Sequence, residues 1–134
     1  MEESAYYLDL ALDVGVPVVV TGAQRRPDEV SPDGPSNLVT AVRVFTDERI
    51  RNTGGVYIAF DEELHAARDA TKRHTRKLDT FESPEKGPVA VTTRDEVRCY
   101  REPEVTLLIW MEVVTYRTST FEWSNPGRAS VATR

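Results

Sequence analysis

Residues 16–21, VPVVVT, run directly into residues 22–37, GAQRRPDEVSPDGPSN, and the two stretches together indicate an α/β fold. A continuous β-branched run of this kind is typical of a strand that a parallel sheet buries on both faces. The loop that follows is polar and long for a connection between a strand and a helix, which makes it a candidate functional loop. In an open α/β sheet, ligands bind where a strand turns into a helix.

The elements on either side alternate in type. Residues 2–13 have the spacing of an amphipathic helix, residues 37–51 predict a second helix with Ser36 as its N-cap, and residues 56–60 predict a second buried strand. This order predicts an α/β protein with a partial doubly wound, mostly parallel sheet and a right-handed crossover. We expect the apolar stripe of the second helix to consist of Leu38, Ala41, Val42 and Phe45.

The rest of the chain is less regular. Residues 61–90 are charged and irregular, with a short strand expected at 64–68, and two further strands are expected at 89–91 and 96–100 around a turn. From residue 105 the composition changes, because residues 105–134 contain both tryptophans and no aspartate or lysine. We therefore predict a domain at 1–104 and a divergent tail at 105–134, which is either a terminal strand with a polar end or a stretch translated out of frame.

The charge balance argues against a nucleic-acid partner. The chain has 22 acidic and 17 basic residues and a formal charge of −5, whereas unspecific binding to nucleic acid needs a basic face. Only 3 of the basic residues are lysines, which fits either a high-salt cytoplasm or a GC-rich genome. The chain opens without a signal peptide, and no apolar run is long enough to span a bilayer, so the expected location is the cytoplasm.

The sequence offers little for a metal or disulfide site. Cys99 is the only cysteine, so we expect no internal disulfide and no zinc cluster, and Cys99 itself to be a packing residue in a strand. The two histidines, His65 and His74, have neither helical i, i+4 spacing nor a companion set of ligands. We therefore predict that no metal and no cofactor bind.

Three stretches together resemble the bacterial-type L-asparaginase family. They are MEESAYYLDL at residues 1–10, the GAQR and PDGP segments of the loop at 22–37, and RDATKRHT at residues 68–75. Each stretch alone also fits an ordinary helix start or a solvated loop, but their order and density match the family over roughly residues 1–103. The resemblance implies a partial copy of the N-terminal domain of a two-domain α/β protein.

The resemblance also implies a chemistry. Such enzymes hydrolyse the side-chain amide of L-asparagine, and to a lesser degree L-glutamine, with threonine hydroxyls and without a cofactor or metal, and they work as homo-oligomers. Lys72 matches the catalytic lysine of the family pattern RD-x-TK-x-x-T, and the backbone at Ala23 matches the position that approaches the substrate amide. A lysine suits this role because burial readily removes its charge, so it can relay a proton from a threonine hydroxyl.

The chain departs from the family at its start. The segment with the attacking threonine, and the Thr-Asp pair that directly precedes such a first helix, do not come before Glu2, and no C-terminal domain follows. The chain therefore reads as one that begins inside a fold, and we expect it to have no asparaginase activity alone, because losing one member of a cooperating set removes nearly all of its contribution.

Three alternatives to a fragment of an asparaginase stay open. The chain is also compatible with an amidotransferase subunit that releases ammonia for tRNA-dependent amidation, although its PDGP turn is more typical of free-standing asparaginases. It is compatible with a non-enzymatic binding module built on the same scaffold. Finally, it fits one half of a split enzyme that a partner chain completes.

Overall fold

The structure, a computed structural model, describes residues 1–102 of the chain. The predicted divergent tail at 105–134 lies outside the described residues. The elements, in chain order, are α1 Glu2–Ala11, β1 Val18–Val20, α2 Gly34–Thr46, α3 Glu48–Arg51, β2 Val56–Phe60, β3 Glu63–Ala66, β4 Thr71–Lys72, β5 Phe81–Glu82, β6 Ala90–Thr92 and β7 Val97–Cys99.

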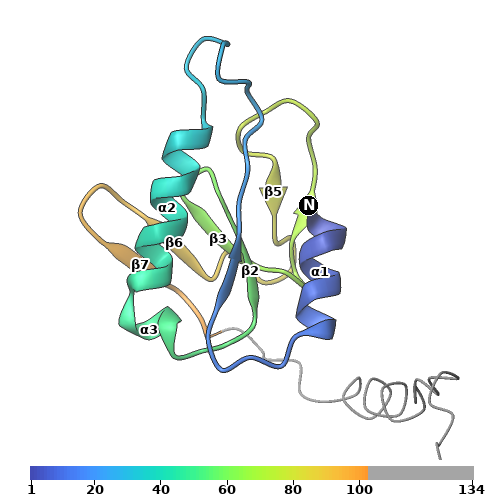
Figure 1. Cartoon of the computed structure of the whole chain (residues 1–134), viewed down its shortest axis with the longest axis vertical. Helices are drawn as coiled ribbons and strands as arrows, with labels where there is room; N and C mark the ends of the chain where they lie inside the picture. The colour runs from blue at the N-terminus through green and yellow to red at the C-terminus, as the bar shows by residue number, and fades with distance from the viewer. Residues whose placement is uncertain (103–134) are drawn as a thin grey trace, which may run out of the picture.

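A five-stranded sheet in the order β1-β2-β3-β6-β7 forms the middle layer, and β4 and β5 form a separate two-stranded ladder. Helices α2 and α3 lie on one side of the sheet and α1 lies on the other, with β1 between them at the edge (Figure 1). The α/β class is thus confirmed. None of the helices within residues 1–102 is long and apolar enough to cross a membrane.

The sheet is mixed, which corrects the prediction of a mostly parallel sheet. Only β1 and β2 pair in parallel among the described strands, whereas the β2–β3, β3–β6 and β6–β7 pairs are antiparallel. The chain reverses after β2 through the two residues Asp61 and Glu62, whose φ angles are 48° and 66°. Both residues are left-handed, as a tight two-residue hairpin requires. Aspartate tolerates this conformation better than most residues, but no glycine follows Asp61, so the sequence carries only a weak signal for this turn.

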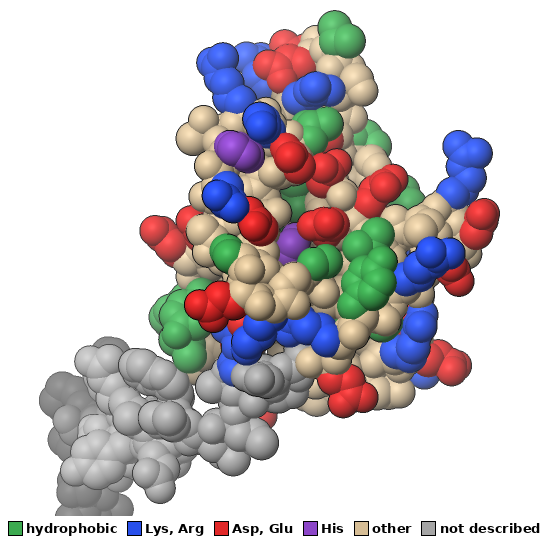
Figure 2. Space-filling view, turned by 180° about the vertical axis from the view of Figure 1, so that it is seen from behind, with side chains coloured by type: hydrophobic (Ala, Val, Ile, Leu, Met, Phe, Trp, Pro, Cys, Tyr) green, Lys and Arg blue, Asp and Glu red, His purple; other side chains and the backbone are tan. Residues whose placement is uncertain are grey.

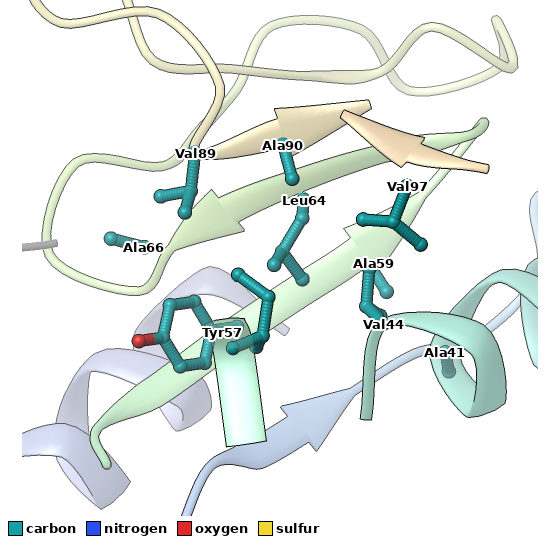
Figure 3. Packing of buried hydrophobic residues seen from close by; sticks show 10 residues of the cluster. Ala41, Val44, Tyr57, Ala59, Leu64, Ala66, Val89, Ala90 and Val97 are labelled. Carbon is teal, nitrogen blue, oxygen red and sulfur yellow. The ribbon is translucent and has the colours of Figure 1, made fainter. Parts of the chain in front are cut away.

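Strand β2 lies between two hydrophobic clusters, and its residues alternate between them. Tyr57 and Ala59 belong to the cluster beneath α2 and α3, whereas Val56, Ile58 and Phe60 belong to the cluster on the α1 side. Figure 3 shows the first cluster, in which Leu64 from β3 and Val89, the residue before β6, also take part. Successive residues of a strand point to opposite faces, so covering both faces requires the unbroken apolar run seen in the sequence.

The second predicted helix exists but differs in its ends and in its buried face. Asp33, not Ser36, is the N-cap of α2, and an extended Asp47 separates α2 from α3. The buried face of α2 consists of Asn37, Thr40, Ala41 and Val44, while Leu38, Val39, Val42 and Phe45 are exposed. The observed face has the predicted spacing moved by one residue, which turns the helix by about 100°. Two polar residues occupy the buried face, so apolar periodicity favoured the wrong one.

This correction predicts a clear difference between two neighbouring valines. Val44 is fully buried and Val42 is 56% exposed. Removing two buried carbons costs about 0.8 kcal/mol each plus a cavity term, so Val44→Ala should lower the free energy of unfolding by about 2 kcal/mol. The matched Val42→Ala should change it by no more than about 0.5 kcal/mol. Urea unfolding of both variants tests this prediction. Equal losses in the free energy of unfolding would contradict the observed buried face of α2.

The surface opposite the view of Figure 1 carries acidic and basic side chains close together. In Figure 2, red and blue groups alternate across this face without a continuous basic area. Within residues 1–102, acidic and basic side chains also form ion pairs, as between Arg73 and Glu82 and between Arg101 and Asp69. Recognition of nucleic acid by charge needs a stripe of one sign, which this face lacks.

Candidate functional site

The candidate site lies where β1 ends. Strand β1 stops at Val20, and Ala23 is an exposed residue in the turn that follows. Gly22 lies beside the start of the chain, because a Cβ built on it would be 2.6 Å from the terminal methyl carbon of Met1, the residue before α1. The turn therefore sits at the carboxyl end of a parallel strand and beside the first helix, the position at which open α/β sheets bind ligands.

Lys72 lies on β4 and reaches the same place from the other side. Its Nζ is 3.4 Å from Oε1 of Gln24, the residue next to Ala23, and its backbone N–H donates to the Glu2 carboxylate. Its ammonium also lies 6.0 Å from the centre of the Phe81 ring, within reach of a cation–π attraction. The structure thus brings together the three stretches that the sequence singled out.

The environment of Lys72 differs from the expected one. The side chain is exposed within the described residues, whereas the proposed chemistry calls for an ammonium that burial discharges. Its contacts are few and weak, since the contact with Gln24 is at the long end of hydrogen bonding. The amine nevertheless points at the Ala23 turn and not away from it.

Two ion pairs fix the segment that leads to Lys72. Arg68 Nη2 lies 3.2 Å from Asp9 Oδ2, which ties the segment to α1. Asp69 is held on the other side by Arg101, with 2.8 Å between Nη2 and Oδ2. The Asp9 side chain is only 9% exposed, and its second oxygen accepts the backbone N–H of Val56. Arg68 and Asp69 therefore anchor the segment before Lys72, Arg68 to α1 through Asp9 and Asp69 to Arg101, which follows β7.

The loop after Ala23 is organised by two residues that the sequence reasoning did not select. Asp33 is 8% exposed, and its carboxylate accepts hydrogen bonds from the backbone N–H groups of Gln24 and Arg25. Asn37, one helical turn later, donates its side-chain N–H to both Asp33 and the Gly22 carbonyl. Their i, i+4 spacing at the start of a helix was a usable signal, because such residues are neighbours on a helix surface.

Electrostatics keep Asp33 ionised. Burial alone would raise the pKa of its carboxyl, but the hydrogen bonds from Gln24, Arg25 and Asn37 outweigh burial and lower the pKa below its ordinary value. No group of three His, Cys, Asp or Glu side chains within residues 1–102 is arranged to hold a metal ion. The groups available for chemistry at this edge of the sheet are thus the Lys72 amine and the Ala23 backbone carbonyl, next to a loop that Asp33 holds in place.

The comparisons with known proteins agree with this geometry. The family model described as "Asparaginase, N-terminal" matches residues 1–105. The chain is 42% identical over 104 residues to the probable periplasmic L-asparaginase of Haemophilus influenzae, covering 78% of this chain and 30% of that protein. It is 37% identical over 103 residues to L-asparaginase 2 of Escherichia coli, covering 77% of this chain and 29% of that protein.

A solved structure shows the same fold. The probable cytoplasmic L-asparaginase of Campylobacter jejuni superimposes with a TM-score of 0.73 at 35% identity, over 78% of this chain and 32% of that chain. The chain thus spans about 30% of the length of the relatives described here. Its match to the family model extends over most of its own length, and the chain belongs to the asparaginase family, in which it corresponds to the N-terminal domain.

Proposed function

We propose that this chain contributes one side of an L-asparaginase active site, where L-asparagine and water give L-aspartate and ammonia. The observation that carries the proposal is the meeting of the Lys72 amine with the Ala23 turn at the carboxyl end of β1, across the 3.4 Å contact between Lys72 Nζ and Gln24 Oε1. The names of the relatives, which are L-asparaginases, support the same reaction class.

Each of the two residues has a distinct task in the proposal. Lys72 takes or relays the proton of a threonine hydroxyl, which is a weak nucleophile until a base adjoins it. The Ala23 backbone carbonyl accepts a hydrogen bond from the substrate's amide N–H. The threonine and the rest of the cleft come from parts of the asparaginase fold that residues 1–102 do not contain.

The setting of the enzyme is also part of the proposal. We infer a cytoplasmic homo-oligomer that acts on L-asparagine, with L-glutamine as a weaker substrate. The Campylobacter jejuni neighbour is described as cytoplasmic, whereas the Haemophilus influenzae relative is described as periplasmic. The high-salt origin suggested by the few lysines stays a prediction from composition.

A complementation assay tests the proposed function. The purified chain is incubated with L-asparagine alone and together with the N-terminal segment of a related asparaginase that carries the attacking threonine and with its C-terminal domain. We expect ammonia release only from the assembled mixture. Assembly without ammonia release would contradict the proposal and favour a binding module. Release by the chain alone would contradict the expectation that it is inactive by itself.

A further inference from the structure

Asp33 occupies the N-cap position of α2 but does not cap that helix. Its side chain accepts no capping hydrogen bond from the backbone N–H groups of the first turn of α2 and turns back to the loop after β1. There, Oδ2 accepts the Gln24 N–H at 2.9 Å and Oδ1 accepts the Arg25 N–H at 2.8 Å. An aspartate at this position ordinarily satisfies the free N–H groups of its own helix, so these contacts call for another explanation.

The Gln24 N–H belongs to the same peptide group as the Ala23 carbonyl. A peptide group is planar and trans, so its N–H and C=O point in opposite directions. By holding the Gln24 N–H, Asp33 therefore fixes the direction of the Ala23 carbonyl on the far side of the plane. A negatively charged acceptor on the N–H also polarises the peptide and makes its carbonyl oxygen a stronger acceptor.

Asn37 holds this arrangement against both parallel strands. Its side-chain N–H groups reach the Gly22 carbonyl and Asp33 Oδ2, each at 3.0 Å, and its Oδ1 accepts the Asp61 N–H at 3.0 Å. Gly22 follows β1 and Asp61 follows β2, so one buried side chain links the carboxyl ends of the two strands.

We propose that Asp33 is a positioning residue that aims and polarises the Ala23 carbonyl for the amide N–H of the substrate, and that Asn37 holds Asp33 in place. The inference rests on the proposed function for its substrate and on the hydrogen bonds for its geometry. It assigns a purpose to the PDGPSN segment beyond shaping a turn.

The geometric part is tested on the full chain, labelled with ¹⁵N and ¹³C, by NMR at neutral pH. We expect through-hydrogen-bond couplings between the Asp33 carboxyl carbon and the amide nitrogens of Gln24 and Arg25. In Asp33→Asn, these couplings should weaken or vanish and the Ala23 carbonyl ¹³C resonance should shift. Absent couplings in the native chain would overturn the proposal, and this measurement does not depend on how well a variant folds.

Asp47→Asn is the matched control. Asp47 also occupies an N-cap position, that of α3, but it does cap its helix, because it accepts the Arg49 N–H at 3.0 Å, and the Arg49 side chain is the main cause that lowers the pKa of its carboxyl. The Asp47→Asn substitution should shift the Arg49 resonances and leave the Ala23 carbonyl ¹³C resonance unchanged. An equal shift of the Ala23 carbonyl in both variants would indicate a general effect on the fold and would overturn the specific role.

The functional part uses the assembled enzyme of the complementation assay. Asp33→Asn should lower kcat/KM for L-asparagine about 100-fold, as small misplacements of a substrate-binding group do, while Asp47→Asn should leave it unchanged. Native couplings with full activity in Asp33→Asn would overturn the positioning role. An assembled native enzyme without ammonia release, but with the couplings present, would contradict the proposed function and leave the geometry of the clamp standing.

Discussion

Replacing Lys72 with alanine is expected to lower ammonia release by the assembled enzyme about 10²–10⁴-fold, the range that a positioned proton-transfer group contributes. The loss should fall on kcat, because the amine handles a proton in the transition state and the resting substrate gains little from it. The stability of the chain should change by no more than about 0.5 kcal/mol, since the Lys72 side chain is exposed and its contacts within residues 1–102 are a 3.4 Å polar contact and a 6.0 Å ring contact.

Two further variants separate proton transfer from charge. Lys77→Ala is the matched control, because Lys77 is an exposed lysine of the same region and contacts Gln24 only through its backbone carbonyl. It should retain activity. Lys72→Arg keeps the positive charge but does not release a proton near neutral pH, so it should be nearly as inactive as the alanine variant. Full activity in the arginine variant would contradict the proton-handling role.

The second large effect concerns His65, which is expected to make the fold lose stability in acid. The ring is 1% exposed, its Nδ1 lies 3.0 Å from Ser83 Oγ, and its Nε2 lies 3.1 Å from Glu63 Oε2 without a well-directed hydrogen bond. Burial, followed by the charge of Arg101, lowers the pKa of His65 to about 4 from its ordinary value of 6.5. The ring is therefore neutral in the folded chain where it would already be charged in the unfolded chain.

The sign and the size of the effect follow from this difference. Between about pH 6.5 and pH 4 His65 is protonated in the unfolded state but not in the folded state, so the free energy of unfolding falls as the pH falls. Below about pH 4 the contribution of His65 to this free energy is lost in full. A difference of roughly two and a half pKa units corresponds to about 3 kcal/mol. The Glu63 carboxyl acts in the opposite direction, because burial and the charges of Asp61, Glu82 and Asp79 raise its pKa.

Comparison of the native chain with a His65 variant separates the effect of the histidine on stability from the effect of the nearby carboxyl groups. Urea unfolding of the native chain and of His65→Gln is measured at pH 7 and at pH 4.5. Glutamine keeps polar atoms in the buried position and does not titrate, so its stability should fall less between the two pH values, by about 2 kcal/mol. Parallel losses in both proteins would show that His65 does not cause the acid sensitivity.

The sequence predicted those parts of the fold that local patterns control. The β-branched and apolar runs placed β1 and β2, and the Gly-rich stop after α3 agrees with positive φ angles at Gly54 and Gly55. These features depend on a few neighbouring residues, so a single sequence contains them. For the candidate site, the roles of Lys72 and Ala23 stay predictions from the family resemblance, although Lys72 Nζ contacts Gln24, the residue next to Ala23.

The missed features depend on contacts between distant residues. The β2–β3 hairpin turns at Asp61 and Glu62, where the Asn37 side chain accepts the Asp61 N–H and no glycine marks the turn. The same Asn37 makes three side-chain hydrogen bonds, which make its burial favourable. The face of α2 that contains Asn37 is therefore buried, although the apolar pattern of the helix predicts another face. Periodicity counts apolar residues and does not register a polar residue that the fold satisfies.

A crystal structure of the assembled enzyme with L-aspartate bound tests the central claim most directly. The account predicts that the ligand's side chain lies against the Ala23 turn and that Lys72 Nζ lies within about 3.2 Å of a threonine hydroxyl from the complementary segment. A ligand bound elsewhere, or a Lys72 ammonium that points into bulk water away from Ala23, would contradict it.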